Sequence, residues 1–303
     1  MKFELTVLGC SSATPTKERH PSAQVLNISD KLFLIDCGEG TQMQLMHYKV
    51  KFQRIDHIFI SHLHGNHYLG LVGLLFTLHL FGRTKEIHIY ANPDLLEIIN
   101  LQFKASETNL LYPLLFHSLT ENKSETLYED EKIWVNSFPL LHRVPTHGFL
   151  FVQKNTLLHL DKERIEHLNI PFDYLPKIKQ GEDYIDGNGK RYLNSELTLP
   201  PQPSKSYAYC SDTAYSSEII PHINNADLLY HEATFMHDME SNAIKKQHST
   251  TLHAARTAIE ANAKRLLVGH FSARYDDLTI LLEETCTAFP NTELAQEGVT
   301  YIV

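Results

Sequence analysis

Histidines are concentrated in one short segment of the chain, HLHGNH at residues 62–67. The segment follows an apolar run at residues 55–60, which predicts a strand, and precedes an apolar stretch at residues 69–81, which predicts a buried helix. Where a strand turns into a helix, His62, His64 and His67 can be aimed at one point. Neutral imidazoles gathered in this way are typical metal ligands.

Three further candidate ligands each stand directly after a predicted strand. His142 follows the strand predicted at residues 133–140, Asp212 follows 207–210 and His270 follows 265–268. A strand end holds a side chain rigidly yet open to solvent, as a metal site requires. A lone histidine is more often an ordinary core or surface residue, but four such positions, counting His62, favour a metal site. These ligands suit Zn²⁺, with Mn²⁺ as an alternative because of the carboxylate.

The composition limits the classes of protein to consider. The 303 residues are 43% hydrophobic and carry a formal net charge of −9, so no overall positive field attracts nucleic acid. The four cysteines are widely spaced without a CxxC pair, which indicates reduced thiols. No apolar run approaches the ~18 residues of a membrane span, and the N-terminus lacks a signal-peptide pattern. We therefore expect a cytoplasmic protein that does not associate with membranes.

The candidate ligands depend on a framework of strands and helices. Longer periodic or apolar stretches predict helices at residues 69–81, 93–103, 251–262 and 278–289. Residues 155–203 are rich in proline and glycine and have little steady period, which indicates an inserted flexible arm. The sequence predicts a single α/β domain over residues 1–303 with this arm protruding. Short apolar runs predict strands at residues 3–8, 24–27, 32–36, 55–60, 86–91, 133–140, 148–153, 207–210, 228–230 and 265–268.

The histidine segment resembles the HxHxDH signature of the metallo-β-lactamase superfamily, and the later single ligands follow in the order of that superfamily. The resemblance covers essentially the whole chain. It implies an αββα sandwich, in which helices flank two mixed β-sheets, and two zinc ions at one edge. By this resemblance His67 and His270 hold the second zinc, and Asp212 bridges both ions. The first zinc is held by His62, His64 and His142.

Other motifs narrow the resemblance to ribonuclease Z. HEAT at residues 231–234 and HST at residues 248–250 are similar to a pair that marks this family. FLIDCGEGTQ at 33–42, HFSARY at 270–275 and PTKERH at 15–20 are similar to its loops. The resemblance implies an endoribonuclease that removes the 3′ trailer of precursor tRNA and leaves a 3′ hydroxyl. It also implies a homodimer in which the arm of one subunit presents tRNA to the other.

The residue types fit the cleavage of a phosphodiester. Two zinc ions acidify water and neutralise the phosphate under attack. A ribose 3′ oxygen is a poor leaving group, so a general acid assists, and His248 beside Glu232 is the candidate. Asp36 is expected to support the ligands rather than to bind metal. Phosphate contacts are predicted for Lys17, Arg19 and Arg274, with a surface ion pair as the alternative for Arg274.

Asn66 departs from the family pattern, because the family carries aspartate at this place in the motif. That aspartate is a ligand of the second zinc and a candidate base for the attacking water. An amide oxygen binds zinc weakly and cannot act as a base, and loss of a general base costs roughly 10²–10⁴ in rate. A natural variant of reduced activity, a non-catalytic descendant and an engineered substitution are all consistent with Asn66. The other expected ligands are intact, which favours an enzyme lineage.

The arm and one loop depart as well. The arm of ribonuclease Z carries a Gly-Pro motif, which residues 155–203 lack, and His20 replaces an asparagine in the loop at 15–20. The arm still offers cations and aromatic rings for an RNA backbone, namely Lys177, Lys179, Lys190, Arg191, Tyr174 and Tyr184. An ordinary solvated loop is the alternative. Two other functions stay open: a phosphodiesterase of small substrates and a non-catalytic RNA-binding protein.

Overall fold

The computed structural model describes residues 2–154, 158–200 and 203–303. The described chain forms two compact units, one containing residues up to 152 together with residues 205–303, and the other containing residues 153–204. Each unit has a hydrophobic cluster of its own. Parts of the predicted arm, residues 155–157 and 201–202, lie outside the described residues.

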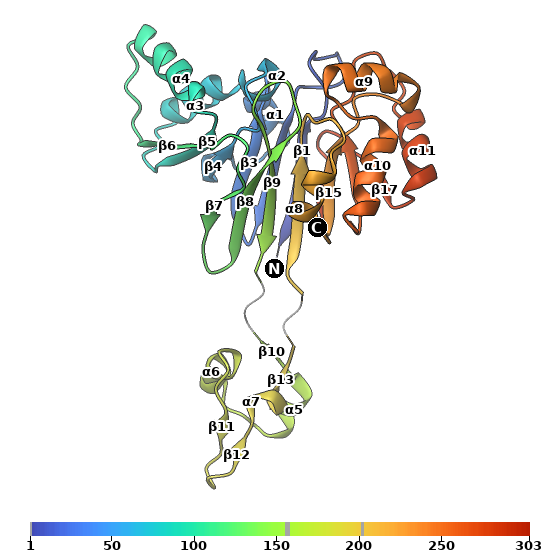
Figure 1. The fold of residues 1–303 in the computed structure, drawn as a ribbon. Coiled ribbons are helices and arrows are strands. Elements are labelled where there is room, and N and C mark those ends of the chain that lie inside the picture. The colour runs from blue at the N-terminus through green and yellow to red at the C-terminus, as the bar shows by residue number, and fades with distance from the viewer. Residues whose placement is uncertain (1, 155–157, 201–202) are drawn as a thin grey trace. The chain divides into compact units, whose positions relative to one another are not determined.

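Two mixed β-sheets form the centre of the larger unit (Figure 1). The first sheet pairs antiparallel from β18 to β3 and parallel from β3 to β6. The parallel part brings the carboxyl ends of β3 and β4 to one edge. In spatial order its strands are β18 (Thr300–Ile302), β1 (Phe3–Gly9), β2 (Ala23–Ile28), β3 (Lys31–Cys37), β4 (Ile55–Phe59), β5 (Ile87–Ala91) and β6 (Leu114–Ser118).

The second sheet is also mixed, with parallel pairing from β14 to β17 and antiparallel pairing of β7 with β8. Its parallel strands likewise end at a common edge, from which loops leave toward the candidate ligands. In spatial order its strands are β17 (Thr292–Leu294), β16 (Leu266–Gly269), β15 (Leu228–Glu232), β14 (Lys205–Cys210), β9 (Thr146–Gln153), β8 (Ile133–Leu140) and β7 (Glu125–Glu129).

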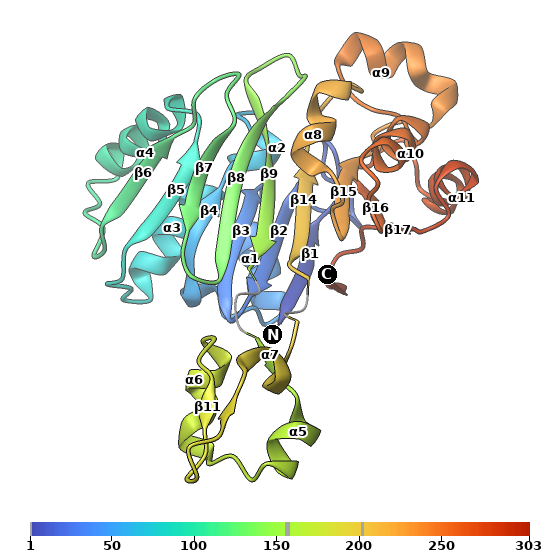
Figure 2. The same cartoon turned by 60° about the horizontal axis from the view of Figure 1, so that its bottom comes forward.

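Helices flank the two sheets on their outer sides (Figures 1 and 2). On the first sheet lie α1 (Thr41–His47), α2 (Gly65–Tyr68), α3 (Leu71–Leu80) and α4 (Asp94–Ala105). On the second lie α8 (Ile220–Ile223), α9 (Glu240–Lys246), α10 (Thr251–Glu260) and α11 (Thr279–Ala288). The layers are therefore helix, sheet, sheet, helix, which confirms the predicted αββα sandwich.

The core lies on both faces of the first sheet. Phe33 on β3 meets Phe151 on β9 with ring centroids 5.8 Å apart, and Phe59 on β4 meets Phe149 on β9 at 5.5 Å. The next residue along β3, Leu34, belongs to the separate cluster under the helices. Because successive side chains of a strand point to opposite faces, β3 is an almost continuous apolar run. This double burial fixes the strand whose end holds Asp36.

Several elements were missing from the sequence prediction. The edge strands β6 and β7 alternate between partly buried and exposed positions, which gives them only a weak apolar signal. Helix α9 is mostly polar and exposed, and it was not predicted either. The helix predicted at 69–81 corresponds to α3, and the short helix α2, which precedes it, was not predicted.

Residues 153–204 contain more regular structure than their sequence indicated. Helices α5 (Lys162–His167), α6 (Leu175–Lys179) and α7 (Asn194–Leu197) accompany two short strand pairs, β10 (His159–Leu160) with β13 (Thr198–Leu199) and β11 (Tyr184–Ile185) with β12 (Arg191–Tyr192). Four apolar side chains form the cluster that these elements share. They are far apart in sequence and show no single period, so a pattern search could not detect them. They are Ile165, Ile170, Ile178 and Leu197.

Candidate metal centre

The predicted ligands lie together at one edge of the larger unit. His62 follows β4 through Ser61, His270 directly follows β16, and Asp212 follows β14 by one residue. His142 follows β8, so both sheets contribute. Within the described residues, His62, His64, His142 and Asp212 form one group of mutually close ligand atoms, and His67, Asp212 and His270 form a second.

The first group has the spacing of a tetrahedral site. His62 Nε2 lies 3.0 Å from His64 Nδ1, which lies 3.3 Å from His142 Nε2. Asp212 Oδ2 is 3.5 Å from His62 Nε2 and 3.8 Å from His142 Nε2. Ligands about 2.0–2.1 Å from a tetrahedral zinc are separated by roughly 3.3–3.4 Å. These four side chains therefore surround a space that fits such an ion.

The second group uses the other oxygen of the same carboxylate. Asp212 Oδ1 lies 3.4 Å from His67 Nε2 and 3.1 Å from His270 Nε2. The Asn66 amide nitrogen lies 3.3 Å from His270 Nε2, so the side chain that departs from the family pattern borders this group. Asp212 thus faces one group with each oxygen, which is the geometry of a bridging carboxylate.

In His67, His142 and His270, the ring nitrogen that points away from the cluster contacts another part of the protein. His67 Nδ1 contacts Asp36 Oδ2 at 2.7 Å, and His142 Nδ1 contacts the Gln247 carbonyl at 2.8 Å. His270 Nδ1 contacts the Thr234 hydroxyl at 2.8 Å. Each contact favours a proton on Nδ1 and leaves the lone pair of Nε2 directed at the cluster.

Asp36 supports this arrangement from the end of β3. Its buried carboxylate accepts hydrogen bonds from the Ser61 N–H at 2.7 Å, the Ser61 hydroxyl at 2.9 Å and the Tyr209 hydroxyl at 2.7 Å. Together with His67, these contacts satisfy a charge that would otherwise be costly to bury. Asp36 therefore lies behind the ligands.

Burial keeps three histidines of the cluster neutral. It lowers the pKa of His62 to about 3 and the pKa of His64 and His270 to about 4, so these rings are neutral near pH 7. Burial alone would raise the pKa of Asp212, but the facing imidazoles outweigh it and keep the pKa well below the usual range. Neutral imidazoles around a carboxylate anion are the protonation states that a divalent cation requires.

His67 provides the clearest sign that a cation fits here. Its Nε2 is buried, forms no hydrogen bond with any described residue, and faces Asp212 Oδ1. Although burial lowers its pKa, the charges of Asp212 and Asp36 outweigh burial and raise the pKa of His67 to about 10. The same negative field that holds a proton on this ring attracts a metal ion. The residues therefore fit a metal centre.

His248 and Glu232 form a buried pair beside the ligands. His248 Nδ1–H donates to Glu232 Oε1 at 2.7 Å, and the same oxygen accepts the Thr213 N–H at 2.9 Å. The other Glu232 oxygen accepts the Thr234 hydroxyl at 2.5 Å. Glu232 is thereby connected to both His248 and His270. Burial alone would lower the pKa of His248, but Glu232 outweighs it and raises the pKa to about 8.

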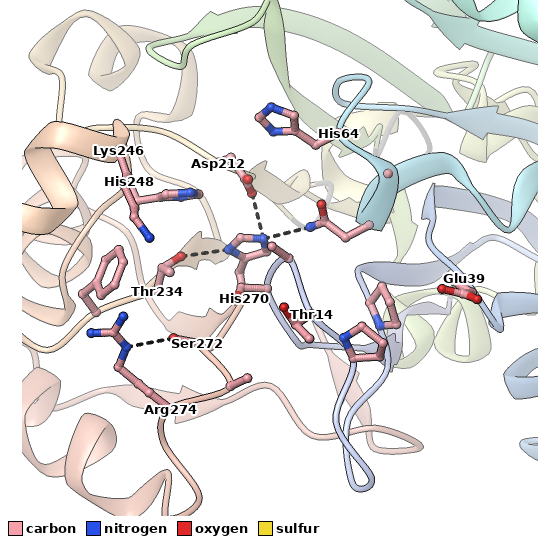
Figure 3. Close-up of a pocket in the computed structure, with 18 of the residues that line it drawn as sticks. Thr14, Glu39, His64, Asp212, Thr234, Lys246, His248, His270, Ser272 and Arg274 are labelled. Carbon is pink, nitrogen blue, oxygen red and sulfur yellow. Dashed lines mark hydrogen bonds and ion pairs between the residues drawn. The ribbon is translucent and has the colours of Figure 1, made fainter.

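A cavity of about 490 Å³ opens onto the cluster. Asp212, His248 and His270 line it, as Figure 3 shows. Asn66 and three cations near the ligands line it as well. Of these cations, Arg274 was predicted from the sequence, and Arg143 and Lys246 were not. Arg143 directly follows the candidate ligand His142, and Lys246 closely precedes the candidate general acid His248. This closeness in sequence was the available signal.

The comparisons with known proteins cover the full chain. Proteins described as "Ribonuclease Z" from Bacteroides fragilis and Cytophaga hutchinsonii are 45% and 44% identical to it, and the matches cover 98% and 100% of this chain and 98% and 97% of those relatives. The chain belongs to the ribonuclease Z family. The crystal structure of human tRNase Z, short form, is similar with a TM-score of 0.73 and 29% identity over 98% of both chains. The resemblance found in the sequence is confirmed.

A second family match covers just over half of the chain. The family model described as "Anti-Pycsar protein Apyc1" matches residues 3–168. The match includes the histidine segment and His142 but ends before Asp212, Glu232 and His248. The match to the Cytophaga hutchinsonii relative covers all of these positions.

The three residues predicted to contact phosphate, outside the arm of this ribonuclease Z homologue, lie in different environments. Arg274 borders the cavity, with its guanidinium over the ring of Phe235 at 5.0 Å. Lys17 is exposed on the loop beside the cavity. Arg19 is buried, and its guanidinium donates to the Tyr275 carbonyl at 2.8 Å, which gives it a structural contact rather than a place in the cavity wall.

The basic residues predicted in the arm lie in the smaller unit. The ammonium group of Lys177 lies over the ring of Tyr174 at 4.9 Å, Lys179 borders a hollow of that unit, and Arg191 pairs with Asp183. Residues 153–204 contain seven lysines and arginines against eight aspartates and glutamates. This unit is therefore not basic as a whole.

We expect Glu232→Gln to lower the pKa of His248 from about 8 to below its ordinary value of about 6.5, because burial then acts without an opposing charge. NMR titration of the His248 ring in metal-free protein measures this shift. Glu240→Gln is the matched control, since Glu240 contacts His253 at 3.1 Å and leaves His248 untouched. An unchanged pKa of His248 in Glu232→Gln would contradict the assignment.

Proposed function

We propose that the chain is a metal-dependent endoribonuclease that removes the 3′ trailer from precursor tRNA and leaves a 3′ hydroxyl on the tRNA. The observation that carries this proposal is the carboxylate of Asp212, which is shared by two sets of histidines, one set at each of its oxygens. Membership of the ribonuclease Z family supports the substrate. The cavity at the cluster would receive the RNA strand.

We propose that two zinc ions occupy the two groups. His62, His64 and His142 would hold one ion, His67 and His270 the other, and Asp212 both. When bound, such ions supply Lewis acidity that activates water and neutralises the phosphodiester. Mn²⁺ is the alternative because of the carboxylate. Asn66 contributes no negative charge to the second group, which therefore binds its ion more weakly than an aspartate-containing site would.

The chain's own residues account for the proton that the leaving group needs. Glu232 holds His248 Nδ1, so the opposite nitrogen of the ring is left for the cavity that His248 lines. A pKa of about 8 keeps this ring protonated near neutral pH. His248 would donate that proton to the departing ribose 3′ oxygen. Without this proton the oxygen would leave as an unstable alkoxide.

Local cations would hold the RNA. The chain as a whole is negative, so the attraction comes from Arg143, Lys246 and Arg274 around the cavity, with Lys17 on the neighbouring loop. Residues 155–203 would form the exosite for the body of the tRNA, with contacts from Lys177 and Lys179. The charge balance of this unit favours a second candidate function, cleavage of small phosphodiesters without the arm.

We also propose a cytoplasmic homodimer. Helices α1 and α3 pack side by side, with the Thr77 hydroxyl donating to Gln42 at 3.1 Å, and they leave apolar side chains in solvent. Met43 is 67% exposed and Leu80 is 80% exposed. Such a surface favours burial against a second copy. No described helix is both long and apolar enough to cross a membrane.

The dimer surface can be tested by charge. We expect the double substitution Met43→Glu and Leu80→Glu to convert a dimer into a monomer, because two carboxylates would be buried without partners. Sedimentation velocity measures the change. Leu101→Glu is the control, since Leu101 is equally exposed, at 67%, but lies on α4. Sedimentation of the unsubstituted chain as a monomer would refute the dimer.

Metal content tests the shared carboxylate. We expect about two zinc ions per chain after equilibrium dialysis, and fewer than one in Asp212→Asn, because a neutral amide binds zinc weakly and removes the bridging charge. Asp227→Asn, at a contact with Ser206 and Lys264, should retain the metal. Elemental analysis provides the count. Equal zinc content in Asp212→Asn and the unsubstituted chain would exclude a bridging role.

Asn66 provides the test of activity. We expect Asn66→Asp to raise phosphodiester cleavage at least tenfold, because it supplies an anionic ligand and a base whose loss costs about 10²–10⁴ in rate. Cleavage of 3′-extended tRNA is measured beside bis(p-nitrophenyl) phosphate. Asn92→Asp, the same change at the start of α4, should have no effect. Equal rates for Asn66→Asp and the unsubstituted chain would refute the role of this position, and cleavage of the small diester alone would favour the second function.

A further inference from the structure

A loop at residues 11–21 forms one wall of the cavity at the metal-ligand cluster. Ser12, Thr14, Pro15 and Pro21 line that wall. The two ends of the loop lie against each other: a Cβ on Gly9 would lie 1.7 Å from the Pro21 carbonyl oxygen, so only glycine permits this approach. The base of the loop is therefore closed, and its middle faces the cavity.

Glu297, near the C-terminal end of the chain, holds this loop through His20. Its Oε1 accepts the His20 N–H at 2.5 Å, and its Oε2 accepts His20 Nδ1–H at 2.8 Å. Oε2 also accepts Gln44 Nε2–H at 2.8 Å, and the Gln44 amide donates to the Leu8 carbonyl at 2.9 Å. The Glu297 side chain is 9% exposed and the His20 side chain is 41% exposed, so these hydrogen bonds are partly shielded from water.

The backbone around Glu297 is fixed in place against β1. The Gly298 N–H donates to the Val7 carbonyl at 2.8 Å, and the Val7 N–H donates to the Val299 carbonyl at 3.3 Å. Gly298 has a φ of +80°, and a Cβ there would lie 2.3 Å from a ring carbon of Tyr48. Glu297 therefore approaches His20 from a turn whose position is set by the sheet.

A second contact anchors the same loop on its other side. The buried guanidinium of Arg19 donates to the carbonyl of Tyr275, in the segment that follows the candidate ligand His270. The loop is thus connected both to the C-terminal strand region and to the segment that carries a ligand. Arg19 and His20 thus anchor the later part of the loop, while the Ser12 N–H donates to the Phe271 carbonyl at 3.0 Å and anchors its beginning.

We propose that Glu297 is a positioning residue, which holds the wall formed by residues 12–15 where the RNA strand enters the cleavage site. This inference rests on the proposed function. Glu297 lines a separate hollow beside Cys10 and Tyr48 and not the cavity at the metal-ligand cluster. It therefore acts on the wall through His20. The proposal also explains the histidine at position 20, where the ribonuclease Z loop carries asparagine. The His20 imidazole forms the second hydrogen bond to the Glu297 carboxylate.

The test compares Glu297→Gln with Glu293→Gln, which alters a neighbouring carboxylate that contacts Arg265. We expect Glu297→Gln to raise KM for 3′-extended tRNA about tenfold with kcat unchanged, the effect of losing one charge-assisted hydrogen bond that positions substrate. Turnover of bis(p-nitrophenyl) phosphate should not change, because so small a substrate does not need the wall. Glu293→Gln should resemble the unsubstituted chain with both substrates.

A readout without catalysis accompanies the kinetics. In Glu297→Gln the amides of residues 11–21 should exchange hydrogen faster, and trypsin should cut sooner after the exposed Lys17. His20→Ala should reproduce both effects, because alanine has no side-chain donor for Glu297. Unchanged KM for tRNA, or unchanged exchange of the loop, would overturn the proposal.

Two other outcomes also decide against it. Equal losses of kcat on both substrates would show that Glu297 supports the metal centre in general and does not position RNA. If the unsubstituted chain fails to cleave tRNA, the proposed function falls and the role in RNA entry falls with it. The exchange measurement would then still show whether Glu297 anchors the loop.

Discussion

The structure of the site depends on one buried carboxylate surrounded by imidazoles. Asp212 is 2% exposed, and its two oxygens face different groups of histidines. An isolated carboxylate would be very costly to bury, so the neighbouring positive or polar groups must stay in place for the fold to tolerate it. The ends of β4, β8, β14 and β16 provide that rigidity, because each strand is held in a sheet up to the residue before its loop.

Two further buried acids extend this constraint outward. Asp36 fixes His67 and Ser61, and Glu232 connects His248 with Thr234 and so with His270. The backbone is strained where the site is built: Asp36 and His270 have φ values of +55° and +58°, in a region that non-glycine residues rarely adopt. Hydrogen bonds from both sheets hold these conformations, and the strain directs the side chains at the cluster.

The distribution of charge limits how such a molecule can recognise RNA. A net charge of −9 repels a polyanion at long range. The smaller unit adds no attraction overall, because its eight acidic residues outnumber its seven basic residues. The proposed attraction therefore depends on local cations, of which Arg143, Lys246 and Arg274 line the cavity.

The sequence by itself predicted the main strands and the candidate metal ligands, because strand periodicity and the spacing of HLHGNH are local properties, and the αββα layering followed from its resemblance to the metallo-β-lactamase superfamily. It identified His142, Asp212 and His270 by their places after strands, and the family by its motifs. It could not show that Asp212 divides its oxygens between two groups, that Arg19 is buried, or that Glu297 reaches His20. Those contacts join segments far apart in the chain, and only the packing of the two sheets determines which of them meet.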